Sequence, residues 1–147
     1  MTLLVAAVIV RDKATNRVVL LQRSQTAKFA QGMWELPFGR TEPGEPITGT
    51  AVRELCEEVG LTVKPESLKV AHIIHSASSQ GLPERLPHRR LLRLRVDRRT
   101  RKPRTCKHAQ VRWVDTDAMP EAFVDTTASA LHCYLDSGPQ VSLDGRE

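Results

Sequence analysis

Residues 39–61 read GRTEPGEPITGTAVRELCEEVGL and contain the clearest secondary-structure signal in the chain. Pro46 suits the first turn of a helix, because the N–H donor that it lacks is not needed there. Gly60 suits the position just after a helix ends. Between them Ala51, Leu55 and Val59 recur at a spacing of four residues and form one apolar stripe. We therefore expect a helix bounded by Pro46 and Gly60, preceded by a loop over residues 38–45.

Three glutamates lie on this expected helix, in the segment Arg53-Glu54-Leu55-Cys56-Glu57-Glu58. Positions three and four apart share a helix face, so Glu54 neighbours both Glu57 and Glu58, and Arg53 can reach Glu57. Like charges at these spacings destabilise a helix by roughly 0.2–0.5 kcal/mol per pair. A bound divalent cation would remove this conflict, and carboxylate oxygens on one face favour Mg²⁺ or Mn²⁺. For the three glutamates alone, a solvated acidic face is the alternative interpretation.

The spacing around the glutamates is more specific than the glutamates themselves. Five residues separate Gly39 from Glu45, and seven more separate Glu45 from Arg53, where the glutamate segment begins. Gly60 and then the aliphatic Leu61 follow that segment. This pattern resembles the Nudix box, the signature of the Nudix hydrolases. Every defining position is matched: Gly39, Glu45, Arg53, Glu54, Leu55, Glu57, Glu58, Gly60 and Leu61. So many restricted positions at fixed spacing rarely coincide by chance.

The resemblance implies a loop–helix–loop motif whose residues have defined roles. Glu57 and Glu58 correspond to metal ligands, and Glu54 to a metal ligand or to the base that activates water. The carbonyl of Gly39 often joins the metal shell. Arg53 orients a neighbouring glutamate through an ion pair, and Glu45 holds the loop against the helix or binds the metal indirectly. The implied cofactor is Mg²⁺, with Mn²⁺ as a substitute, and water attacks phosphorus without a covalent nucleophile.

Outside the box the resemblance is looser. Residues 18–23, 34–37 and 111–114 look like the flanking strands and lead-in of the MutT-like branch, which acts on nucleoside triphosphates. We take Arg23, Lys107 and Trp113 as candidate substrate-binding residues. For Trp113 a place in the core is the alternative to stacking on a base.

Two positions depart from the family pattern. Phe38 stands where the family usually has a second glycine beside Gly39. Arg104 stands where related chains often carry an acidic residue before the lysine that aligns with Lys107. An auxiliary carboxylate is therefore missing at that position, and arginines are available to bind phosphates instead.

Apolar and β-branched runs predict strands on both sides of the helix. The expected strands cover residues 3–10, 18–22, 68–74, 91–96 and 111–114, and a second helix covers 126–135. Because strands and helices do not alternate regularly, we expect an α/β fold of the α+β type, with a mixed β-sheet sandwiched between helices. We expect one domain over residues 1–136 and a C-terminal tail over residues 137–147.

The composition indicates a globular protein. With 147 residues, of which 40% are hydrophobic, the chain is long enough for one domain with its own core. No apolar run is long enough to span a bilayer, so we expect no membrane partner. Charged residues follow residues 2–10 directly, which favours a buried strand over a signal peptide. Three cysteines without paired spacing argue against a disulfide framework and favour the cytoplasm.

The net charge of +5 is concentrated, because arginines and lysines crowd between residues 85 and 107. Such a cluster favours phosphates, nucleotides or RNA as binding partners, or simply makes a soluble surface.

We expect a nucleotide or another phosphorylated small molecule as substrate, and the preferred reaction converts a nucleoside triphosphate to the monophosphate and pyrophosphate. Nucleotide sugars, dinucleoside polyphosphates and capped RNA ends remain open. The second hypothesis is a non-catalytic nucleotide- or RNA-binding regulator, with RNA less favoured. The sequence leaves monomer and homodimer open.

Overall fold

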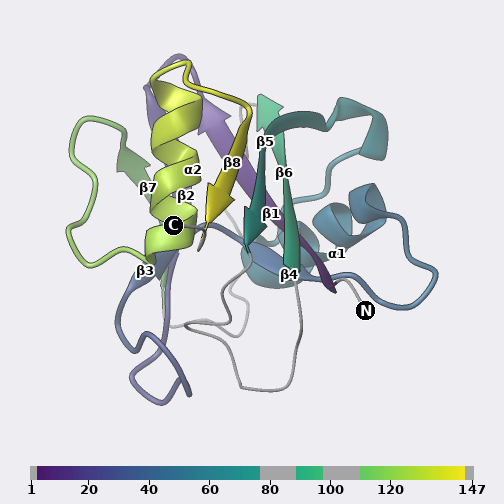
Figure 1. Ribbon diagram of the computed structural model, residues 1–147. Coiled ribbons are helices and arrows are strands. Elements are labelled where there is room, and N and C mark those ends of the chain that lie inside the picture. Colours follow the sequence, from purple (N-terminus) through teal and green to yellow (C-terminus); the bar gives the residue numbers. More distant parts are fainter. Residues whose placement is uncertain (1–2, 77–88, 98–109, 145–147) are drawn as a thin grey trace.

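The computed structural model describes residues 3–76, 89–97 and 110–144 (Figure 1). Its centre is one mixed sheet in the order β3-β2-β1-β6-β5-β8, with β4 paired to β1 and β7 to β2. The strands are β1 (Leu3–Asp12), β2 (Arg17–Gln22), β3 (Trp34–Glu35), β4 (Phe38–Arg40), β5 (Lys69–Ser76), β6 (Arg89–Asp97), β7 (Gln110–Asp115) and β8 (Val141–Asp144). The helices are α1 (Ile47–Val59), α2 (Asp125–Leu135) and the short 3₁₀ helix η1 (Pro65–Ser67).

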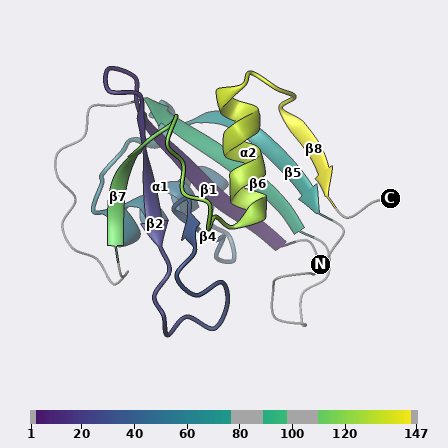
Figure 2. The same cartoon turned by 90° about the vertical axis from the view of Figure 1, so that its left-hand side faces the viewer.

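Alternating side chains of β1 and β2 fill two cores on opposite faces of the sheet. On one face, Ala6, Val8 and Val10 of β1 pack with the apolar stripe of α1, which is Ala51, Leu55 and Val59. On the other face, Ile9 and Leu20 pack with Leu131 of α2. This alternation follows from the period of two along a strand. The two helices therefore cover opposite faces, as the expected sandwich requires (Figures 1 and 2).

The chain between β2 and α1 fills the space where β1 and β2 diverge. These two strands pair at Arg11↔Val18 and Asp12↔Arg17, next to their hairpin turn. Farther along, β3 continues beside β2 and β4 pairs antiparallel with β1. The bond from the N–H of Val8 to the carbonyl of Pro37, 2.8 Å, joins the two short strands to the sheet. This arrangement places Gly39 beside α1, because α1 packs on β1 and β4.

The structure differs from the sequence expectations at three points. Residues 38–40 form β4 instead of a loop, because β1 offers an unpaired edge there. Pro46 is the N-cap of α1 and does not lie in its first turn; the N–H of Thr50 donates to its carbonyl. Residues 141–144, expected in a tail, form β8 and pair parallel with β5.

Within residues 3–76, 89–97 and 110–144, no helix is both long enough and apolar enough to cross a lipid bilayer.

Candidate active site

Helix α1 presents the three glutamates because its opposite side is buried. Leu55 and Val59 are fully buried in the core, which fixes the rotation of the helix about its axis. The helix ends at Gly60, whose φ of 73° is left-handed and costs a glycine little. The N–H of Gly60 donates to the carbonyl of Cys56, and this cap ends the helix just after Glu58.

Gly39 lies directly against the carboxyl group of Glu54. A Cβ atom added at Gly39 would overlap the Cδ and Oε1 atoms of Glu54. The neighbouring residue of β4 adds a second contact, because the N–H of Phe38 donates to Oε2 of Glu58 at 3.0 Å. The loop–helix–loop motif therefore brings the backbone of β4 into contact with two of the expected metal-ligand side chains.

Arg53 connects the loop before α1 to the glutamates on it. Its Nε donates to Oε1 of Glu45 at 3.0 Å, and its Nη2 donates to Oε2 of Glu45 at 3.1 Å. Its Nη1 donates to Oε1 of Glu54 at 2.6 Å and lies 3.6 Å from Oε2 of Glu57. A further bond runs from Nη2 to the carbonyl of Arg40. One guanidinium group thus holds Glu45, Glu54 and β4 relative to one another and lies close to Glu57.

Glu45 is held by donors from three directions. Besides Arg53, its Oε2 accepts from the hydroxyl of Thr50 at 2.7 Å and from the N–H of Glu42 at 3.1 Å. These bonds, with Arg53 as the largest cause, lower the pKa of the Glu45 carboxyl to about 2. In turn, the bonds to Glu45 and then to Glu54 hold the pKa of the Arg53 guanidinium well above its ordinary range. Glu45 therefore stays ionised and fixes the loop against α1.

The three glutamates of α1 have different environments although they share a face. The Glu54 side chain is 13% exposed, and its burial raises the pKa of the carboxyl above its ordinary value, while the bond from Arg53 opposes this shift. The charge of Glu58 raises the Glu54 pKa further. The Glu57 side chain is 60% exposed. Glu54 is therefore much more enclosed by protein groups than Glu57.

Part of the expected repulsion is relieved by protein groups. Arg53 neutralises Glu54 and approaches Glu57, and the Phe38 N–H binds Glu58. Across residues 3–76, 89–97 and 110–144, no three His, Cys, Asp or Glu side chains are already gathered around a common metal position. The donor set still fits a hard cation, because it is made of carboxylate oxygens on one helix and the contact at Gly39 leaves no side chain between β4 and Glu54.

The other predicted site residues come from separate parts of the chain. Arg23 follows β2, where its Nη1 binds both carboxyl oxygens of Glu35 at 3.0 and 3.2 Å and its Nε donates to the carbonyl of Phe29. Trp113 on β7 is partly buried and packs on the core beside α1. Arg53 is bonded to Glu45, Glu54 and Arg40, so its bonds connect neither Arg23 nor Trp113 to the glutamates. Lys107 and Arg104 lie outside the described residues.

The backbone donors and acceptors of the site were not visible in the sequence. The N–H of Phe38 and the carbonyl of Arg40 bind Glu58 and Arg53 because β4 pairs with β1, and such groups carry no residue signature. The hydroxyl of Thr50 was also missed. A buried threonine facing a loop carboxylate becomes recognisable only after the loop is placed.

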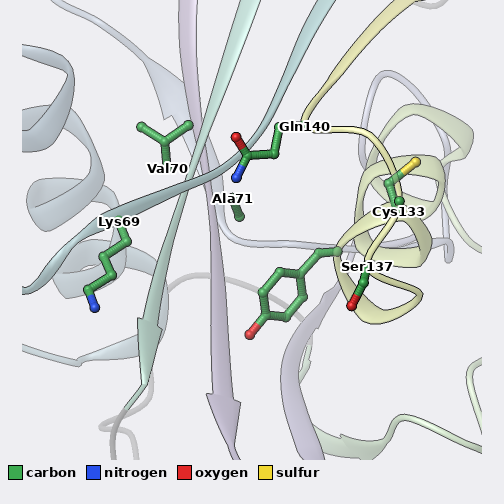
Figure 3. Close-up of a pocket in the computed structure, with 8 residues that line it drawn as sticks. Lys69, Val70, Ala71, Cys133, Ser137 and Gln140 are labelled. Carbon is green, nitrogen blue, oxygen red and sulfur yellow. The ribbon is translucent and has the colours of Figure 1, made fainter.

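A surface cavity of about 460 Å³ lies between the start of β5 and the end of α2 (Figure 3). It is lined by Lys69, Val70, Ala71, Cys133, Tyr134, Ser137, Gly138 and Gln140. In the close-up the polar groups of Lys69, Gln140 and Ser137 lie apart and do not point to a common centre. The cavity therefore lacks the convergent polar groups that mark a specific site.

A model of the NUDIX domain family matches residues 1–132, which is most of the chain. The chain therefore belongs to the Nudix family. The members of this family generally use divalent metal ions.

Among its relatives, the human 8-oxo-dGDP phosphatase NUDT18 is 43% identical over 53 residues, which are 36% of this chain and 16% of that protein. The RNA pyrophosphohydrolase of Pseudoalteromonas atlantica is 39% identical over 59 residues, which are 40% of this chain and 33% of that protein. The matches therefore span less than two thirds of either relative's length.

Solved structures with the same architecture include MutT-type proteins. The MutT Nudix hydrolase of Burkholderia pseudomallei has a TM-score of 0.73 at 19% identity, over 90% of this chain and 97% of that one. The E. coli dihydroneopterin triphosphate pyrophosphohydrolase has a TM-score of 0.70 at 19% identity, over 92% and 96%. These likenesses confirm the mixed α+β fold with its two helices.

Proposed function

We propose that this chain is a hydrolase that cleaves a phosphoric anhydride bond in a nucleoside diphosphate linked to a further group. The preferred reaction converts a nucleoside triphosphate to the monophosphate and pyrophosphate. A divalent cation, Mg²⁺ or in its place Mn²⁺, is the proposed cofactor. A reducing cytoplasm is the proposed setting and suits a chain whose three cysteines show no paired spacing.

One observation carries this proposal: Gly39 packs directly against Glu54, while Arg53 joins Glu54 to Glu45. The first contact leaves room only for a glycine, and the second holds a partly buried carboxylate in one orientation. Groups held in this way act with little rearrangement during a reaction. A merely acidic surface would need neither contact.

The residues of this chain have separable roles in the proposed reaction. Glu57 and Glu58 would bind the cation, together with the carbonyl of Gly39. A cation held there would neutralise phosphate oxygens and polarise water. Glu54, whose pKa is raised by burial, accepts the proton of the attacking water or serves as a further ligand. Arg53 and Glu45 keep these carboxylates in position.

A substrate screen is the experiment that identifies the preferred leaving group and nucleobase of the substrate. Relatives are named for 8-oxo-dGDP, RNA and dihydroneopterin triphosphate, which carry linked phosphates on different organic groups. Arg23 and Trp113 remain the proposed substrate-binding residues in the described part of the chain, with Lys107 outside it. The Nε and Nη1 atoms of Arg23 are engaged by Phe29 and Glu35, and its charge is paired with the Glu35 carboxylate, so a direct contact with a phosphate would use Nη2.

The proposal is tested by a panel of nucleoside triphosphates, oxidised nucleotides, nucleotide sugars and capped RNA, incubated with Mg²⁺. The products are separated by chromatography, and release of pyrophosphate or of a nucleoside monophosphate is measured. We expect Glu57→Gln to lower turnover by about a hundredfold or more without unfolding the protein. Glu66→Gln on η1 is the matched control, because Glu66 is an exposed carboxylate outside the motif. Activity should require added Mg²⁺ and disappear with a chelator. Undiminished turnover in Glu57→Gln would remove the metal assignment.

The competing function is a nucleotide- or RNA-binding regulator on the same fold. It predicts RNA binding that weakens as salt rises and no turnover of any compound on the panel. The intact set of Glu54, Glu57 and Glu58 favours the hydrolase, because binding alone does not need all three. Tight, salt-dependent RNA binding by a protein inactive on the whole panel would reverse this preference.

A further inference from the structure

Thr50 lies at a position where the Nudix box restricts no residue type, between Glu45 and Arg53. It is fully buried although its side chain is polar. Its hydroxyl donates to Oε2 of Glu45 at 2.7 Å, the shortest of the bonds that this carboxylate receives. A buried hydroxyl needs a partner, and this one is satisfied by an acceptor that itself belongs to the motif.

From Thr50 a continuous chain of bonds reaches the glutamates. The hydroxyl holds Oε2 of Glu45, Glu45 holds Arg53 through two nitrogens, and Arg53 holds Oε1 of Glu54 at 2.6 Å. Each link is a side chain less than one third exposed. Charge-assisted bonds of this kind are directional, so a displacement of Glu45 is passed on to the guanidinium group.

We propose that Thr50 is a positioning residue of the cation site: its hydroxyl sets Glu45, and through it the orientation of Arg53 that keeps Glu54 and Glu57 available to a divalent cation. This inference rests on the proposed function only in one respect, which is that the glutamates of α1 bind a divalent cation. Outer groups that orient metal ligands commonly change metal affinity or activity by about 10- to 100-fold when they are removed.

Substitution by valine isolates the hydroxyl. Thr50→Val keeps the branched shape and replaces the donor with a methyl group that would press against Oε2 of Glu45. Thr50→Ser keeps the donor. We expect Thr50→Val to weaken Mn²⁺ binding about tenfold, measured from the electron paramagnetic resonance signal of free Mn²⁺, and Thr50→Ser to bind within about twofold of the natural protein.

Thr127 is a matched control at the start of α2. It is also buried, at 4% exposure, and its hydroxyl donates to the carbonyl of Val124 at 2.8 Å. Thr127→Val therefore loses a buried hydroxyl in the first turn of a helix on the other face of the sheet. We expect it to leave Mn²⁺ affinity unchanged, whatever it does to the melting temperature.

The outcomes separate cleanly. Equal Mn²⁺ affinity in Thr50→Val and the natural protein overturns the inference, as does an equal loss in Thr127→Val. If Thr50→Val does not fold, Thr50→Ala removes the hydroxyl without a clash and is judged by the same tenfold criterion. A natural protein that binds no Mn²⁺ overturns the inference as well. A natural protein that binds Mn²⁺ but hydrolyses nothing overturns the proposed function, while the Thr50 comparison is still decided by binding.

Discussion

Gly39 is required by contact and not by backbone conformation. Gly44 and Gly60 have the positive φ angles that favour glycine, 78° and 73°, whereas Gly39 is an ordinary strand residue of β4. What excludes a side chain at Gly39 is the carboxyl group of Glu54. Because that group is the end of a flexible side chain, it can move aside without disturbing the core.

We therefore expect Gly39→Ala to separate stability from function. The free energy of unfolding should change by no more than about 1 kcal/mol, while turnover and Mn²⁺ affinity fall at least tenfold because Glu54 is displaced. Urea denaturation and Mn²⁺ titration measure the two effects. Gly138→Ala, which follows α2, is the control, since the atoms nearest its new Cβ would all belong to Cys133. Gly39→Ala with unchanged Mn²⁺ affinity would show that the close approach does not matter.

At the scale of elements, one ion pair joins the loop before α1 to the helix itself. Glu45 lies eight residues before Arg53 and precedes α1, so the helical repeat of 3.6 residues per turn does not account for their pairing. The pair forms because residues 41–46 fold back over the start of α1, with the Glu45 N–H bound to the carbonyl of Glu42. It therefore contributes to the stability of the motif as a unit.

The pH dependence of the free energy of unfolding should reflect the ion pair between Glu45 and Arg53. In the folded chain the pKa of Glu45 is about 2, below the ordinary 4.5. The unfolded chain therefore binds the proton first as pH falls, so the stabilisation is full above about pH 4.5 and is lost between there and pH 2. We expect the unfolding free energy of Glu45→Gln to depend less steeply on pH in that window, measured by urea denaturation. Glu66→Gln controls for the loss of one charge, and a Glu45→Gln slope equal to that of the natural protein would contradict the prediction.

The sequence predicted those elements that carry their own signals. Pro46, Gly60 and the stripe of Leu55 marked α1 to within a residue or two, since these signals are local. It did not predict β4 and β8. Residues 38–40 have no alternation and include a glycine, and they become a strand only because β1 provides partners. Residues 141–144 are too short to show a period and are ordered by β5.

The same limit holds for the candidate site. Helical spacing predicted that Glu54, Glu57 and Glu58 share a face, and the family resemblance implied that Arg53 pairs with a glutamate. Spacing could not predict that Glu54 is 13% exposed and Glu57 60%, because this difference comes from Gly39 and β4 covering one end of the face. The environment of each carboxyl group, and with it the pKa of that group, depends on tertiary contacts that helical spacing does not reveal.

Considered whole, the molecule has two cores that share one sheet. The proposed site lies on the α1 face, while α2 packs on the other face against β5. The edge strand β8 is joined to β5 by backbone pairing and by a side-chain bond of 2.8 Å between Nε2 of His72 and Oγ of Ser142. His72 is 1% exposed, so loss of this bond leaves a buried polar atom without that partner.

Stability and catalysis should therefore respond to different substitutions. We expect Ser142→Ala to lower the unfolding free energy by about 1–3 kcal/mol, the usual effect of removing one partner of a buried hydrogen bond. Its turnover number, measured well below the melting temperature, should equal that of the natural protein, because β8 is at the edge of the sheet and α1 packs on β1 and β4. Leu143→Ala on the same strand is the control: its side chain is 64% exposed, and we expect a change within about 0.5 kcal/mol. Urea denaturation and steady-state kinetics on the same preparations decide the matter. A Ser142→Ala protein of natural stability but reduced turnover would mean that β8 acts on the site and that the two faces are not independent.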